Sequence, residues 1–107
     1  MSETPFSVVS ERRGSGWQIV ARGELDIATV PSLERDLLAA EQTDADTIVL
    51  DLSGLSFIDS TGLKLLLDAN DRSNGADRLR IIAAGSPTLE RLLDIVGLRE
   101  RLPLITP

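Results

Sequence analysis

The chain has 107 residues, with 17 acidic and 11 basic side chains, 42% hydrophobic content, and neither Cys nor His. A chain of this length forms one compact core, burying roughly two-thirds of the surface its unfolded form exposes. Without Cys and His it has no ligands for a zinc or haem site, no thiol nucleophile and no imidazole base, so we expect no metal and no cofactor. A metal site would have to consist of carboxylates, which suit Mg²⁺ or Ca²⁺.

The net charge of −6 and the pI near 4.5 argue against a nucleic-acid partner, because binding to phosphates depends on clustered Lys and Arg. The acids are concentrated in residues 24–59, a segment that contains nine acids and one arginine. The start of the chain has no basic and apolar signal, and nowhere do 18 apolar residues follow one another. We therefore expect a soluble, cytoplasmic protein without membrane insertion, one domain over residues 1–107, and a flexible tail at residues 1–5.

The first elements read as a β-hairpin. Residues 6–12 and 17–22 have the composition of two strands, joined by residues 13–16, whose two glycines tolerate the positive φ of a tight connection. Trp17, Ile19 and Ala21 share one face of the second strand, and we expect Trp17 to pack in the core or at an edge.

A helix and a buried strand come next. From Val30 the apolar residues follow the helical period, with Asp26 or Thr29 available as N-cap and Pro31 tolerated in the first turn. Residues 47–52 form a continuous apolar run, which is typical of a central strand covered on both faces.

The second half alternates in the same way. A second helix is predicted to begin near Ser60 and to stop at Asn74 and Gly75, followed by a buried strand at residues 80–84. Ser86 and Gly97 are the predicted caps of a third helix, and residues 102–105 are compatible with a short final strand. The order β-β-α-β-α-β-α(-β) predicts an α/β domain: a four- to five-stranded mixed sheet with helices mainly on one face.

In such a fold the loops after the strands are the natural place for a site. Residues 23–26, 59–62 and 84–86 occupy these loops. Asp59 and Ser60 stand at a helix N-terminus, where unpaired amides favour a negative group by about 0.3 to 1 kcal/mol and a phosphate could be received. The local pattern leaves a plainer reading open, in which Ser60 is only the helix N-cap.

Three stretches together resemble the STAS domain of bacterial anti-sigma factor antagonists: Gly-Glu-Leu-Asp at 23–26, Ile-Val-Leu-Asp-Leu-Ser at 48–53 and Phe-Ile-Asp-Ser-Thr-Gly-Leu at 57–63. The resemblance covers essentially the whole chain. It implies that Ser60, directly after the aspartate, is phosphorylated by a partner that is both a serine kinase and an anti-sigma factor and that itself binds the ATP.

The resemblance further implies a switch between partners. The unphosphorylated chain would bind the kinase and release the sigma factor, and a PP2C-type phosphatase would reset the phosphorylated form. The chain itself would not be an enzyme. The predicted partner-binding residues surround the serine: Glu24, Asp26, Asp59, Ser60, Thr61, Gly62, Leu63 and Lys64. Lys64 is a departure, because familiar members often carry a small residue there, and whether it contacts a partner or is solvated stays open.

Other readings remain open at this point. The same fold could brace the ATPase of a lipid-transport ABC complex without any phosphorylation. The Asp-Ser-Thr-Gly stretch is similar to the Asp-Thr/Ser-Gly loop of aspartic proteases, although an extra residue intervenes and the fold expected here is not all-β. Asp26 and Asp59 could act as an acid and base pair, but two acids more often belong to caps and interfaces.

Overall fold

The computed structural model describes residues 5–73 and 77–106. The elements in chain order are β1 (Ser7–Arg13), β2 (Gly16–Leu25), α1 (Val30–Glu41), β3 (Ile48–Ile58), α2 (Ser60–Ser73), β4 (Leu79–Ile82), α3 (Pro87–Val96), a 3-10 turn (Arg99–Arg101) and β5 (Leu104–Ile105). This order confirms the predicted alternation, including the short final strand.

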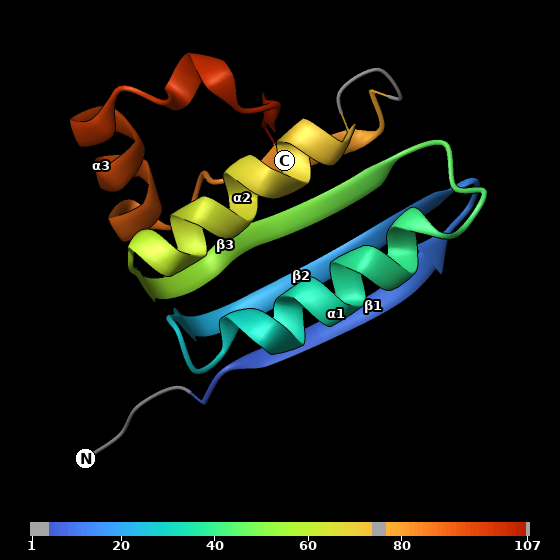
Figure 1. Cartoon of the computed structure of the whole chain (residues 1–107), viewed down its shortest axis with the longest axis horizontal. Helices are drawn as coiled ribbons and strands as arrows, with labels where there is room; N and C mark the ends of the chain where they lie inside the picture. Colours follow the sequence, from blue (N-terminus) through green and yellow to red (C-terminus); the bar gives the residue numbers. More distant parts are fainter. Residues whose placement is uncertain (1–4, 74–76, 107) are drawn as a thin grey trace.

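The strands form one five-stranded sheet in the order β1-β2-β3-β4-β5. The β1 and β2 strands pair antiparallel, and the three pairings that follow are parallel. In Figure 1, α1 and α2 cross the same side of the sheet, and α3 lies at the end where β3 finishes. The predicted mixed sheet with helices mainly on one face is confirmed, and this α/β architecture excludes the nearly all-β aspartic proteases.

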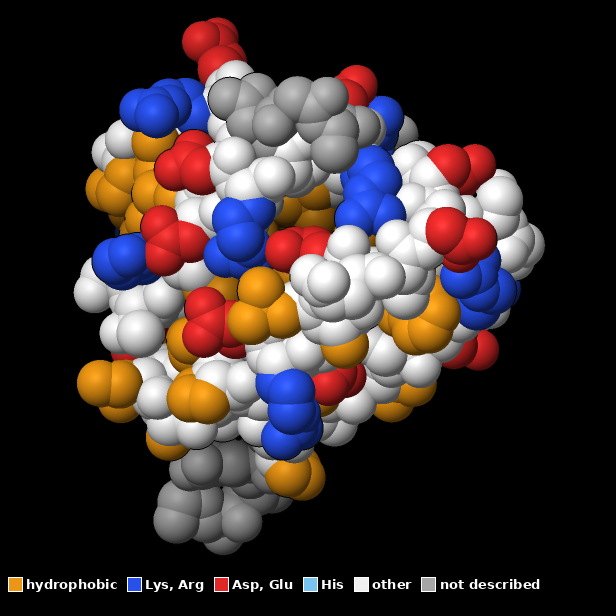
Figure 2. Space-filling view, turned by 45° about the vertical axis from the view of Figure 1, so that its right-hand side comes forward, with side chains coloured by type: hydrophobic (Ala, Val, Ile, Leu, Met, Phe, Trp, Pro, Cys, Tyr) orange, Lys and Arg blue, Asp and Glu red, His pale blue; other side chains and the backbone are white. Residues whose placement is uncertain are grey.

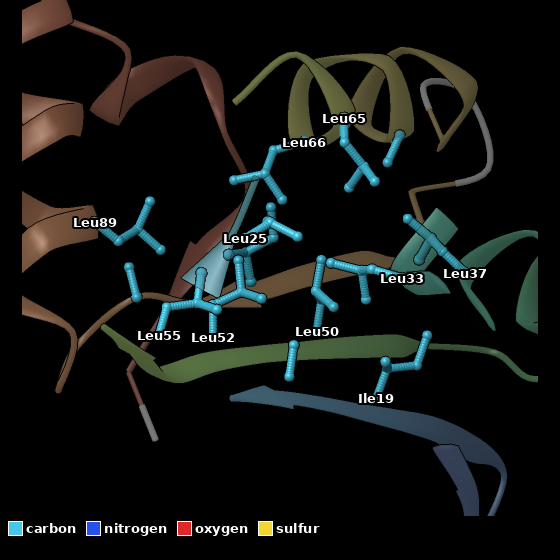
Figure 3. Packing of buried hydrophobic residues seen from close by; sticks show 14 of the residues in the cluster. Ile19, Leu25, Leu33, Leu37, Leu50, Leu52, Leu55, Leu65, Leu66 and Leu89 are labelled. Carbon is cyan, nitrogen blue, oxygen red and sulfur yellow. The ribbon is translucent and has the colours of Figure 1, made fainter. Parts of the chain in front are cut away.

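The core fills the space between the sheet and its helices, as the labelled side chains in Figure 3 show. The fully buried leucines and isoleucines come from every layer: Ile19, Leu25, Leu33, Leu37, Leu50, Leu52, Leu66, Ile81, Leu89 and Leu93. Burying one such side chain stabilises the fold by about 1.5 to 3 kcal/mol. Alternate residues of β3, Ile48, Leu50 and Leu52, are buried in this layer, whereas Val49 and Asp51 are half-buried. The central position predicted for residues 47–52 is confirmed, but the expectation that both faces are covered is wrong.

The hairpin between β1 and β2 forms as predicted, with a shorter connection. Only Gly14 and Ser15 lie between the strands, and Gly14 has the positive φ of 62° that the turn requires. Trp17 is half-buried, and the Arg12 guanidinium lies 5.5 Å from the centroid of its ring. Of the two predicted alternatives, packing against the core is confirmed for Trp17.

Two strands are longer than predicted. The β2 strand continues beyond residue 22 to Leu25, and β3 continues beyond residue 52 to Ile58. The pairing of β2 with β3 is shifted at two places, between Val20 and Arg22 and between Gly23 and Glu24. Such bulges absorb residues that break the alternation, so a sequence that reads as a loop stays in the sheet.

The last strands are shorter than predicted. The β4 strand ends at Ile82 instead of residue 84, and β5 begins at Leu104 instead of residue 102. The caps of α3 are confirmed, with Ser86 at its N-cap and Gly97 in the left-handed conformation at its C-cap. The predicted stop of α2 at Asn74 and Gly75 lies outside the described residues.

Candidate functional site

The carboxyl ends of β2 and β3 lie side by side and bring two of the predicted loops together. Glu24 is opposite Phe57 in the parallel register, and Leu25 is opposite Ile58. Directly beyond this pairing the Asp59 amide donates a hydrogen bond of 3.2 Å to the Leu25 carbonyl. Residues 23–26 and 57–63 therefore form one continuous surface, as their predicted position at the strand ends requires.

Asp59 is the N-cap of α2. Its Oδ1 accepts hydrogen bonds from the amides of Thr61 at 2.9 Å and Gly62 at 3.1 Å, and its carbonyl accepts from the Leu63 amide at 3.0 Å. A carboxylate at this position satisfies the unpaired amides and interacts favourably with the positive end of the helix dipole. The expectation that Ser60 stands among unpaired amides is therefore wrong for Thr61 and Gly62, whose amides are occupied by Asp59.

Ser60 is the first residue of α2 and is exposed. The reading in which Ser60 serves as the N-cap is wrong, because Asp59 occupies that position. The cap is complete without the serine hydroxyl, which is presented to solvent at the surface where β2 and β3 end. A modifying enzyme can reach this hydroxyl without unfolding the helix.

Gly62 is buried at the closest approach of α2 to the sheet. A Cβ at this position would lie 2.8 Å from Cγ1 of Ile58 and 3.0 Å from both Cγ and Cδ2 of Leu25. These separations are too short for ordinary packing, so glycine is required for α2 to sit at this height above β2 and β3. Leu63 is half-buried against the core and Thr61 is half-buried. Gly62 therefore contributes by allowing α2 to lie close to β2 and β3.

The turn between β2 and α1 is closed by Asp26 and Thr29. Asp26 Oδ1 accepts from the amides of Ala28 at 3.0 Å and Thr29 at 3.2 Å, while the Thr29 hydroxyl donates to the Glu24 carbonyl at 2.7 Å. Asp26 thus has the same kind of structural task as Asp59. Glu24 is different, since its side chain is exposed.

Lys64 is exposed and paired within its own helix. Its Nζ lies 2.8 Å from Oδ2 of Asp68, one turn further along α2. This hydrogen bond and the charge of Asp68 raise the pKa of Lys64, with a smaller contribution from the charge of Glu34. Lys64 is thus positively charged at neutral pH with an acid beside it.

The third predicted loop is structural. Ser86 is fully buried, its hydroxyl donates to the Leu55 carbonyl at 2.8 Å, and the hydroxyl oxygen accepts from the Leu89 amide at 3.3 Å. It fixes α3 to β3 and caps that helix, which confirms the capping role expected of it.

Two apolar residues of this surface were not singled out from the sequence. Ile27, in the turn before α1, is 75% exposed, and Phe57, near the end of β3, is 44% exposed. Phe57 belongs to a strand that is otherwise rich in buried residues, and hydrophobicity alone cannot distinguish an exposed position from a buried one. The sequence signal available for the exposure of Ile27 is its position between Asp26, an acid of the turn, and the start of α1.

Several hollows of the described part of the chain lie away from this surface. Three of them, of about 380, 280 and 180 Å³, are lined by residues of the α1–α2 end, the hairpin end and the β4–β5 edge. Within residues 5–73 and 77–106, no group of three or more acids is placed to hold a metal ion. In the same ranges no helix is both long enough and apolar enough to cross a bilayer. None of these three hollows is lined by residues 23–26 or 57–63.

Comparison with known proteins agrees with this geometry. The STAS domain family model matches residues 9–106. The chain is 34% identical over 84 residues to proteins named anti-sigma-B factor antagonist from Staphylococcus epidermidis and Staphylococcus aureus, which covers 78% of this chain and 78% of each relative.

Solved structures match as well. An anti-sigma factor antagonist from Mycobacterium paratuberculosis superimposes with a TM-score of 0.85 at 26% identity, covering 96% of this chain and 86% of that one. The unphosphorylated form of the anti-sigma factor antagonist SpoIIAA superimposes with a TM-score of 0.72 at 25% identity, covering 94% and 88%.

Proposed function

The chain belongs to the STAS-domain family and, within it, to the anti-sigma factor antagonists, and we propose that it exchanges partners through the phosphorylation state of Ser60. As an anti-sigma factor antagonist it is a regulator and not an enzyme. In the proposed cycle the unphosphorylated chain binds, in the cytoplasm, an anti-sigma factor that is also a serine kinase, and the sigma factor is released. A PP2C-type phosphatase restores the free hydroxyl.

The exposed hydroxyl of Ser60 at the start of α2 is the observation that carries this proposal. The kinase would transfer the γ-phosphoryl group of its ATP to the Ser60 oxygen. The new P–O bond replaces the bond to ADP, and the hydroxyl proton leaves to a base of the kinase. The phosphoserine then carries about −1.5 to −2 charges near neutral pH.

The Asp59 cap explains why the added charge would act on the complex. Asp59 already occupies the amides of Thr61 and Gly62, so the phosphate cannot use them without displacing a carboxylate. The phosphate is therefore held outside the helix end, beside an acid and on the docking face. This replaces the expectation that the domain's own amides would take up the phosphate.

The size of the effect is sufficient for a switch. A dianion meeting a surface shaped for a small hydroxyl costs several kcal/mol through mismatched charge and volume. About 3 kcal/mol already weakens binding more than a hundredfold. The acids around Ser60 would also attract a basic partner and speed the encounter. Glu24 is the exposed one among them, whereas Asp26 and Asp59 also hold their helices in place.

Calorimetric titration of the purified host kinase with variants of the chain tests the proposal. Ser60→Ala should bind as the unmodified chain does, and Ser60→Asp should bind at least a hundredfold more weakly. Ser15→Asp adds the same charge at an exposed serine of the β1–β2 turn and should bind normally. Mass spectrometry of the chain after incubation with kinase and ATP should place the phosphate on Ser60.

Equal affinity of Ser60→Ala and Ser60→Asp would overturn the mechanism. Co-purification from host cells with a transporter ATPase, with Ser60 unmodified, would instead favour a brace for an ABC complex.

A further inference from the structure

Two large apolar side chains are exposed on the segments that surround Ser60. Ile27 is 75% exposed and Phe57 is 44% exposed. Single exposed apolar residues are ordinary on protein surfaces, and the chain has others. These others lie on β1, α1, α3 and β5 and not on the two segments that flank Ser60: Val9, Leu38, Ile95, Val96 and Ile105. The position of Ile27 and Phe57, more than their exposure, therefore calls for an explanation.

The backbone joins both residues to the phosphorylation site. Phe57 lies two residues before Asp59, and Ile27 lies two residues after Leu25. The Asp59 amide donates to the Leu25 carbonyl, and adjacent strands of a sheet are about 4.8 Å apart. A protein that covers the Ser60 hydroxyl therefore docks beside the backbone that carries both side chains.

Both side chains are carried by ordered backbone. Phe57 belongs to β3 and is held in register opposite Glu24. Ile27 is in the turn that Asp26 and Thr29 close with their side chains. Because the backbone is already fixed, docking of these side chains costs little additional conformational entropy, which is the condition for an effective anchor.

The negative charge of the same segments indicates a partner surface that carries basic residues. Residues 23–31 and 55–63 contain three acids and no base, a formal charge of −3. We propose that Ile27 and Phe57 are the apolar anchors of the complex with the anti-sigma factor kinase, and that they enter an apolar depression of the kinase rimmed by Lys and Arg. This inference rests on the proposed function, and it assigns affinity to residues other than the one that is phosphorylated.

Paired substitutions separate the anchors from general surface hydrophobicity. Ile27→Ser and Phe57→Ser should each weaken binding of the unphosphorylated chain to the purified kinase at least tenfold, since anchor residues dominate interfaces. Ile95→Ser on α3 and Val9→Ser on β1 remove side chains that are 71% and 58% exposed and should change the dissociation constant by less than twofold. Thermal unfolding of each variant checks that the fold is kept.

The outcomes separate this inference from the proposed function. Ile27→Ser and Phe57→Ser binding within twofold of the unmodified chain, while Ser60→Asp still loses binding, would overturn the anchors and leave the switch intact. Failure of the unmodified chain to bind the kinase would overturn both. A second measurement uses no variant: complex formation should slow amide hydrogen exchange at residues 24–29 and 56–61 and leave α3 unchanged.

Discussion

The two ends of the sheet satisfy the backbone in opposite ways. Where β2 and β3 finish, Asp59 accepts hydrogen bonds from the amides that begin α2, and Asp26 accepts from the amides of Ala28 and Thr29 in the turn before α1. At the other end, α1 finishes with free carbonyls, and the Arg78 guanidinium donates to the carbonyls of Glu41 at 2.7 Å, Thr43 at 3.1 Å and Ala45 at 2.7 Å. Each end thus receives the sign of charge that its helix termini favour.

The two ends differ in the side chains that take no part in satisfying the helix termini. At the arginine end the charges are paired, since Arg72 also forms two hydrogen bonds of 3.0 Å with the Glu41 carboxylate. Figure 2 turns this end toward the viewer and shows acidic and basic side chains interspersed. At the acidic end Glu24 has no capping task, and Ile27 and Phe57 are exposed. One end stabilises the fold, and the other combines capping residues that the fold needs in any case with the surface proposed to bind the partner.

The largest effect is expected from removing Arg78 at the arginine end, the end of the sheet where α1 finishes. Arg78→Ala removes one donor group from three carbonyls and should lower the free energy of unfolding by about 3 kcal/mol, because bonds to charged donors are worth about 1.5 to 3 kcal/mol each and water replaces part of them. Urea denaturation measures the loss. Arg78→Lys, which keeps the charge but cannot span three carbonyls, should recover only part of it.

The affinity of Arg78→Ala for the kinase tests whether the two ends of the sheet are independent. Below its unfolding transition, Arg78→Ala should bind the kinase like the unmodified chain. A loss of affinity beyond threefold in the folded variant would mean that the two ends are not independent, and unchanged stability would remove Arg78 from its structural role.

The fold was predictable because its signals are periodic and local. Apolar residues at helical spacing predicted α1 and α2, and Ser86 and Gly97 marked the ends of α3. The continuation of β3 to Ile58 was not predictable, since Ser53 and Gly54 look like a loop and remain in the sheet through bulges in β3 itself, which has one residue more than β2 at each register shift. Pairing between strands depends on tertiary contacts, which the sequence of one segment does not determine.

The site was predictable in location but not in its internal division of tasks. The Asp-Ser-Thr-Gly stretch predicted a reactive position at the start of α2. Asp59 and Ser60 are both good N-cap residues, so only the geometry shows that Asp59 takes the amides and leaves Ser60 exposed. The contribution of Ile27 and Phe57 depends on exposure, which hydrophobicity does not report.

A smaller effect separates the two tasks of Asp59. Asp59→Ala removes the cap and should cost about 1 kcal/mol in unfolding free energy, whereas Asp59→Asn keeps an acceptor for the amides of Thr61 and Gly62 and should cost only a few tenths. Urea denaturation of the pair measures the cap. Titration with the kinase measures the charge, and Asp59→Asn should bind more weakly and with a smaller salt dependence, because a carboxylate that attracts a basic surface is gone. Equal stability of the alanine and asparagine variants would mean that the two hydrogen bonds contribute nothing.

The smallest effect concerns Lys64, an exposed base in the second turn of α2. Its pKa lies above the ordinary value of 10.5, first because the ammonium group donates a hydrogen bond to Asp68 and then because of that residue's charge. A raised folded pKa means that the stabilising contribution is complete below about 10.5 and disappears as the pH rises through the folded value. Asp68→Asn should therefore return the pKa of Lys64 toward its ordinary value in an NMR titration of the side chain.

At neutral pH this pair is fully formed, but its lysine side chain is 74% exposed, so solvent screens it and Lys64→Gln should leave the unfolding midpoint unchanged. Because Asp68 already compensates the ammonium charge, the kinase should bind Lys64→Gln within twofold of the unmodified chain. A loss of tenfold or more would place Lys64 in direct contact with the partner and extend the docking surface one turn along α2, beyond the acids that cap the helix.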